Sequence, residues 1–85
     1  MQFKELCRAL GNPERVRIVA CLTRETTVTD LLKKCKLSQS ALSQHLAVLR
    51  RSGIVHARTD GRYVYYQTMS RDYIDLAKTI ISLTT

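Results

Sequence analysis

The sequence is poor in aromatic residues, with no tryptophan and one phenylalanine, so any hydrophobic core must be built from aliphatic side chains. Its 85 residues suffice for one small domain, close to the size at which a single core is only marginally stable. We therefore expect residues 1–85 to form a single domain. A second copy of the chain would add buried area, so a homodimer is expected on size grounds.

Long apolar runs are also missing, which excludes a membrane-spanning helix and a secretory signal peptide. The three cysteines are an odd number and lie far apart in the chain, so a disulfide framework is not expected. Both features favour a protein that stays in the reducing cytoplasm.

Acidic residues are scarce, with seven against 14 basic ones, giving a net charge of +7. Nearly all of the excess lies between Leu31 and Arg62, where Asp60 is the only acidic residue. The basic residues of that segment are Lys33, Lys34, Lys36, Arg50, Arg51, Arg58 and Arg62. A clustered positive charge is typical of a nucleic-acid surface, and no strongly apolar face supports a membrane surface instead.

Catalytic patterns are absent as well. The chain has no glycine-rich phosphate loop, no paired carboxylates at a useful spacing, and no cysteine or serine that the fold would bring to a histidine. We predict neither an enzyme nor a bound cofactor.

Residues 37–51 predict one amphipathic helix that begins after Ser38, whose hydroxyl can cap the first turn. Leu42, Leu46 and Leu49 fall on one face of this helix and should point into the core. The other face bears small or polar side chains and no acid, namely Ser40, Ser43, Gln44, Ala47 and Arg51. Such a face suits a DNA recognition helix, although an ordinary surface helix is the alternative.

Three further helices are expected before this one. The first two cover residues 2–10 and about 13–23, separated by Gly11, Asn12 and Pro13, which end one helix and begin the next. On the second helix we expect Arg15 and Arg17 to be exposed. Thr27 and Asp30 then fit a capping box at the start of a short helix over residues 28–35. This helix and the recognition helix, joined by a tight turn, form a helix-turn-helix pattern.

Residues 54–59 and 62–68 are rich in β-branched and aromatic side chains and flank Asp60-Gly61, a strong hairpin signal. Arg58 and Arg62 bracket the tip. A hairpin with a basic tip after a recognition helix is typical of the wing of a winged helix, which lies along the DNA backbone or in a minor groove. A purely structural hairpin is the alternative.

The last helix is predicted from a cap at Ser70 to about residue 83 and carries two adjacent apolar stripes. One small core does not need both, so we expect this helix and the first to form a homodimer interface. A helix folded entirely onto its own core is the alternative. The expected interface residues are Phe3, Leu6, Cys7, Leu10, Tyr73, Leu76, Ile80 and Leu83.

Together the elements predict a mainly α winged helix-turn-helix domain with the order ααααββα. Three stretches also resemble the ArsR/SmtB family of bacterial transcriptional repressors. Residues 9–19 (ALGNPERVRIV) are similar to its ALADPTRLRIL segment, residues 37–46 (LSQSALSQHL) to LSQSTVSHHL, and residues 61–66 (GRYVYY) to the GRxVYY of its wing. The resemblance implies a homodimer that binds an inverted-repeat operator and is often released by a metal ion or another inducer.

The metal-binding positions of the family are changed in this sequence. Thr27 and Thr29 replace the two cysteines of the ELCVCDL motif, and a neutral hydroxyl is a poor ligand for a soft metal ion. In the zinc-sensing pattern of the last helix, Asp72 is followed two residues on by Ile74 in place of histidine. We therefore expect no metal site and leave the inducer unknown. Cys7 is a candidate thiol switch, whereas Cys21 and Cys35 are expected to be small core residues.

The expected DNA-binding residues fall into three groups. Those facing the bases are Ser40, Ser43, Gln44 and Ala47; those holding the backbone are Gln39, His45, Arg50 and Arg51; those anchoring the wing are Arg58 and Arg62. Two other functions remain open at this point, a winged-helix module that binds another protein and a nonspecific architectural DNA binder.

Overall fold

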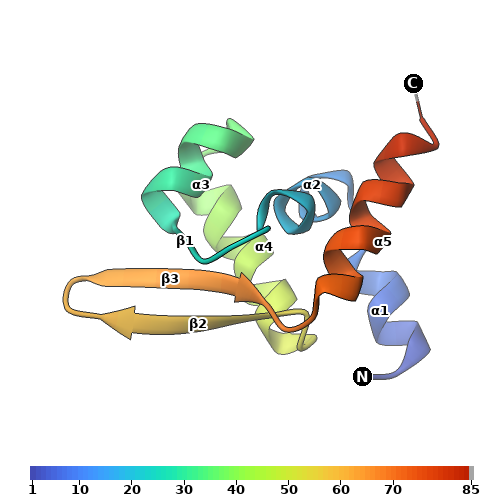
Figure 1. The fold of residues 1–85 in the computed structure, drawn as a ribbon, viewed down its shortest axis with the longest axis horizontal. Helices are drawn as coiled ribbons and strands as arrows, with labels where there is room; N and C mark the ends of the chain where they lie inside the picture. Colours follow the sequence, from blue (N-terminus) through green and yellow to red (C-terminus); the bar gives the residue numbers. More distant parts are fainter. Residues whose placement is uncertain (85) are drawn as a thin grey trace.

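The computed structural model of the chain describes residues 1–84, which form five helices and three strands (Figure 1). The helices are α1 (Phe3–Ala9), α2 (Pro13–Cys21), α3 (Val28–Cys35), α4 (Gln39–Arg51) and α5 (Arg71–Ser82), and the strands are β1 (Thr26–Thr27), β2 (Val55–Asp60) and β3 (Tyr63–Thr68). The predicted winged helix-turn-helix order is confirmed, with the β2–β3 hairpin as the wing. None of the helices in residues 1–84 is long and apolar enough to cross a membrane.

Four helices begin at a side chain that accepts a hydrogen bond from the free backbone N–H groups of the first turn. At α2 the side chain of Asn12 accepts from the N–H of Arg15, and at α3 that of Thr27 accepts from Asp30. At α4 the side chain of Ser38 accepts from the N–H of Ala41, and at α5 that of Ser70 accepts from Asp72. All four capping residues match the sequence prediction. The predicted ends are less accurate, since α1 and α2 stop before residues 10 and 23.

The core is aliphatic, as the scarcity of aromatic residues predicts. Helix α2 lies at its centre, packed against α3, α4 and α5, and its Ile18 and Val19 are fully buried. Leu31 of α3 and the three leucines of α4 belong to the same buried cluster. In Figure 1 the hairpin extends away from this helical body, while α1 and α5 lie at the opposite end.

Strand β1 was not predicted. Its residue Thr26 falls between two predicted helices, yet it pairs with Tyr66 of β3 and is only 5% exposed. The sheet therefore has three strands in the order β1-β3-β2. A two-residue strand is too short to show an alternating pattern, so sequence periodicity could not reveal it.

The turn of the wing lies one residue later than predicted. Asp60 still pairs with Tyr63, so the two-residue loop is Gly61-Arg62 rather than Asp60-Gly61. Of these two loop residues only Gly61 has a positive φ, at +61°, which corresponds to a turn that needs glycine at its first central position. As a result, Arg62 lies at the very tip of the wing.

Candidate nucleic-acid interface

A sharp turn between α3 and α4 sets the position of the recognition helix. Lys36 ends α3 in the left-handed conformation, with φ +54°, and its N–H donates to the carbonyl of Leu32. Two residues later the hydroxyl of Ser38 caps α4. Leu37, between these two residues, is half-buried against the core and so helps to fix the angle of the turn.

Helix α4 divides into two faces as predicted. Leu42, Leu46 and Leu49 are at most 1% exposed. The exposed residues are Gln39, Ser40, Ser43, Gln44, Ala47, Arg50 and Arg51, which include every base-facing residue predicted from the sequence. The first turn of α4 bears no acidic residue, and the last carries Arg50 and Arg51. This outward face is therefore neutral to cationic, with short side chains that allow close approach to a polyanion.

His45 differs from the other predicted contacts because it is half-buried. Its Nδ1 lies 3.4 Å from Nη1 of Arg15 on α2. Arg15 is also half-buried, which corrects the prediction that it is exposed. Its guanidinium turns inward because it donates to the carbonyls of Ala9, at 2.6 Å, and Arg8, at 3.2 Å, which are left free at the end of α1.

The two arginines of the wing have different surroundings. Arg62 is exposed at the tip, and no ion pair within residues 1–84 includes it. Arg58 instead forms a two-pronged ion pair with Glu25, from Nε to Oε2 at 2.9 Å and from Nη2 to Oε1 at 3.0 Å. A second carboxylate, that of Asp60, lies 3.6 Å from its Nη1.

This pair changes the titration of both groups. The hydrogen bond from Arg58 holds the pKa of the Glu25 carboxyl below its usual range, and the same bond raises the pKa of Arg58. Glu25 was not singled out in the sequence, because it lies 33 residues from Arg58 and no local pattern links the two. The structure thus adds one residue to the region of the wing and places Arg58 differently from Arg62.

The three cysteines lie in different environments. Cys7 is exposed on α1, whereas Cys21 and Cys35 are half-buried. Burial, together with the neighbouring Cys21, raises the pKa of the Cys35 thiol to about 11. Cys35 is therefore protonated and weakly nucleophilic at neutral pH.

The residues at the family's metal positions have other surroundings here. The Thr27 hydroxyl caps α3 by accepting a hydrogen bond from the N–H of Asp30. Ile74 is buried in the core at 3% exposure, next to an exposed Asp72 on α5. The hydroxyls of Thr27 and Thr29 at the start of α3, and an isolated carboxylate on α5, do not fit the soft or histidine-containing donor sets that such sites require.

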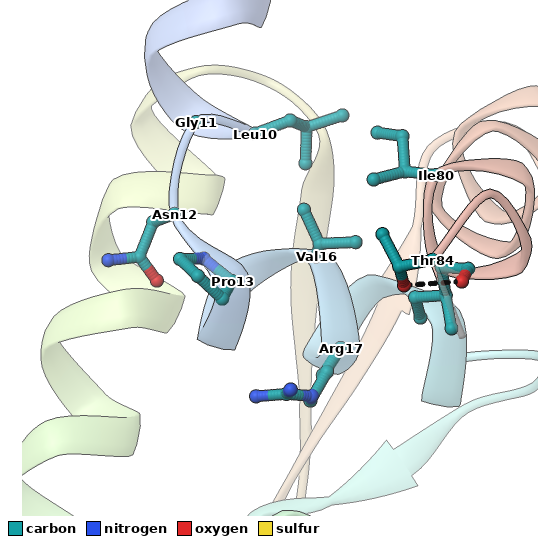
Figure 2. A pocket seen from close by; sticks show the side chains of 9 residues that line it. Leu10, Gly11, Asn12, Pro13, Val16, Arg17, Ile80 and Thr84 are labelled. Carbon is teal, nitrogen blue, oxygen red and sulfur yellow. Dashed lines mark hydrogen bonds between the residues drawn. The ribbon is translucent and has the colours of Figure 1, made fainter.

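An apolar groove lies between the α1–α2 turn and the end of α5 (Figure 2). It has a volume of about 400 Å³, and Leu10, Val16 and Ile80 face one another across it. Beyond the groove, Phe3 and Leu83 are both 81% exposed. Three predicted interface residues, Leu6, Leu10 and Tyr73, instead pack partly against the core of their own chain.

A helix-turn-helix with an acid-free outward face, followed by a hairpin with an arginine at its tip, defines a winged-helix DNA-binding domain. Comparison with known proteins agrees with this class. The family model described as "Bacterial regulatory protein, arsR family" matches residues 12–57, and the chain belongs to this family.

Individual relatives lead to the same family. The chain is 43% identical over 68 residues to the transcriptional activator HlyU of Vibrio cholerae, covering 79% of this chain and 63% of HlyU. It is 36% identical over 80 residues to the transcriptional repressor SmtB homolog of Synechocystis, covering 93% of this chain and 61% of that protein. It thus spans less than two thirds of either protein.

The crystal structure of HlyU from Vibrio vulnificus has the same fold, with a TM-score of 0.81 and 41% identity. The match covers 96% of this chain and 86% of that one. The chain therefore carries the winged-helix DNA-binding domain of ArsR-family transcriptional regulators.

Proposed function

We propose that the chain acts in the cytoplasm as a homodimeric repressor that binds an inverted-repeat operator. Each copy inserts α4 into a major groove and lays its wing along the adjacent backbone. The outward face of α4 is the main support for this proposal, because it combines short polar side chains, two terminal arginines and no acid.

Within this interface the residues have different roles. Ser40, Ser43, Gln44 and Ala47 contact base edges or thymine methyl groups, since they are exposed near the middle of the outward face. Gln39, Arg50 and Arg51, at the two ends of the helix, hold the phosphate backbone. His45 reaches the DNA backbone only from the edge of α4, because the Nδ1 side of its ring faces Arg15.

Dimerisation uses the face formed by α1 and α5. Leu76, Ile80 and Ile81 are 39%, 37% and 42% exposed, and all three lie on α5. Monomeric proteins rarely leave such a surface uncovered. A second copy related by a two-fold axis covers it and sets the two recognition helices at a fixed separation, as a palindromic operator requires.

Sedimentation of the purified chain tests the dimer. We expect a dimer for the unaltered chain and a monomer for Ile80→Glu, because the new carboxylate would be buried in the interface. Met69→Glu, which alters an exposed apolar residue between β3 and α5, is the control and remains dimeric. A monomeric unaltered chain would contradict this part of the proposal.

Repression rather than activation follows from steric exclusion, because a dimer covering an operator blocks access of polymerase to the promoter. The named relatives include both an activator and a repressor, so the direction needs its own test. A reporter gene placed behind an operator that has been selected from random DNA should increase in expression when the chain is removed. A decrease would assign the chain as an activator.

Release from DNA does not use the family's metal positions, since Thr27, Thr29 and Ile74 supply no suitable donor. Binding to the operator should therefore be unchanged by a chelator and by added zinc or cadmium. Release by either metal would overturn this part of the proposal.

Selection from random DNA tests the function as a whole. We expect one palindromic sequence, bound tightly in the presence of excess random DNA and with a steep salt dependence. Equal binding to all sequences would favour the architectural DNA binder. No binding to DNA would favour the protein-interaction module.

A further inference from the structure

The side chain of Arg58 reaches across the sheet two residue pairs from the tip of the wing. Arg58 lies on the outer strand β2, opposite Tyr65 of the central strand β3, and Tyr65 in turn pairs with Thr27 of β1. The guanidinium carbon is 4.8 Å from the centre of the Tyr65 ring, and its nitrogens bind Glu25, which lies directly before β1. One side chain thereby connects all three strands.

The contacts differ from those of an ordinary exposed ion pair. A two-pronged guanidinium–carboxylate pair has a fixed geometry, and stacking of the guanidinium on an aromatic face restricts it further. Asp60 adds a second carboxylate at 3.6 Å. Two carboxylates and an aromatic ring surround the Arg58 guanidinium, so its positive charge is largely compensated. If Arg58 turned to bind a DNA phosphate, it would lose every one of these contacts.

We propose that Arg58 is a positioning residue that, with Glu25 and Tyr65, latches the wing to β1 and the start of α3, and that Arg62 makes the phosphate contact of the wing. This inference rests on the proposed DNA interface and reassigns one of its residues. Strand β1 leads directly into α3, the first helix of the helix-turn-helix, so the latch fixes the wing relative to α4.

Opposite effects of two substitutions separate the latch from a phosphate contact. If Arg58 is a latch, Glu25→Ala and Arg58→Ala each weaken DNA binding by about two- to fivefold, and the double variant is no weaker than Arg58→Ala alone. The dependence of affinity on salt keeps its slope, because no phosphate contact is lost. If Arg58 instead binds phosphate, Arg58→Ala makes the slope shallower by about one unit, and Glu25→Ala strengthens binding by freeing the arginine.

Matched controls remove the effect of net charge. Asp75→Ala changes the net charge by the same amount as Glu25→Ala. Arg71→Ala likewise matches Arg58→Ala. Arg71 and Asp75 form an exposed ion pair on α5. Each variant is compared with its control on a duplex of random sequence, because a phosphate contact does not depend on base sequence. Glu25→Ala weaker than Asp75→Ala supports the latch, and Glu25→Ala equal to or tighter than Asp75→Ala overturns it.

Amide hydrogen exchange in the free protein provides a second readout. Both Glu25→Ala and Arg58→Ala should speed exchange in residues 56–66, whereas Arg62→Ala should leave it unchanged. Unchanged exchange in the first two variants would overturn the latch. Failure of the unaltered chain to bind any DNA would overturn the proposed function and this inference together, whereas the variant comparison can fail alone.

Discussion

Arg15 joins the end of α1 to the recognition helix, since its Nε donates to the Ala9 carbonyl at 2.6 Å and its Nη1 lies 3.4 Å from Nδ1 of His45. The same guanidinium contacts α1, which belongs to the proposed dimer face, and α4, which belongs to the proposed DNA face. A shift of either helix must therefore disturb these contacts.

Replacing Arg15 by alanine should lower the free energy of unfolding by about 1–3 kcal/mol, because carbonyls at the end of α1 lose a charged donor. Chemical denaturation measures the change. Arg17→Ala, which removes an exposed arginine from the same helix, should lie within about 0.5 kcal/mol of the unaltered chain. Equal stability of the two variants would show that the contacts of Arg15 contribute nothing.

Leu46→Ala should be more damaging, lowering the free energy of unfolding by about 2–5 kcal/mol. Leu46 is 1% exposed within the core, so the substitution leaves a cavity beneath α4. Met69→Ala is the control, because Met69 is 59% exposed between β3 and α5 and leaves no such cavity. If both variants melted at the temperature of the unaltered chain, α4 would have to be oriented the other way.

Arg62→Ala should weaken binding to all DNA sequences alike and make the salt slope shallower by about one unit. The reason is the position of Arg62 at the wing tip, where it is exposed. Affinities measured at several salt concentrations give the slope, with Arg71→Ala as the charge-matched control. A change of sequence preference with an unchanged slope would assign Arg62 to base recognition instead.

Acidification should weaken the latch in a defined direction. The pKa of Glu25 is lowered by Arg58, so the pair contributes to stability at neutral pH and this contribution is lost as the pH falls through the lowered pKa. Melting temperatures of the unaltered chain and Glu25→Gln, measured from about pH 7 to about pH 3, should therefore converge at the acidic end. A difference that stays constant with pH would show that ionisation of Glu25 plays no part.

The fold was predictable because its signals are local. The four caps at Asn12, Thr27, Ser38 and Ser70 and the leucine spacing of α4 can each be recognised within a few residues of sequence. Strand β1 could not be recognised in this way, because it is defined by its partner β3, some 40 residues further along, and not by its own two residues.

The site was predictable only in part for the same reason. Exposure of Ser43, Gln44 and Arg51 follows from helical periodicity, and the structure agrees. The surroundings of Arg58 and Arg15 depend on Glu25 and on the carbonyls of α1, which the fold brings close from distant or non-periodic positions. Charge counts identify where cations gather, but not which of them already have a carboxylate partner.

The affinity of Gln44→Ala for the selected operator and for random DNA tests most directly whether the outward face of α4 reads sequence. We predict a loss of about 1–3 kcal/mol on the operator and almost none on random DNA, with an unchanged melting temperature. Equal losses on both DNAs, or no loss on either, would contradict recognition of bases by this face of the helix.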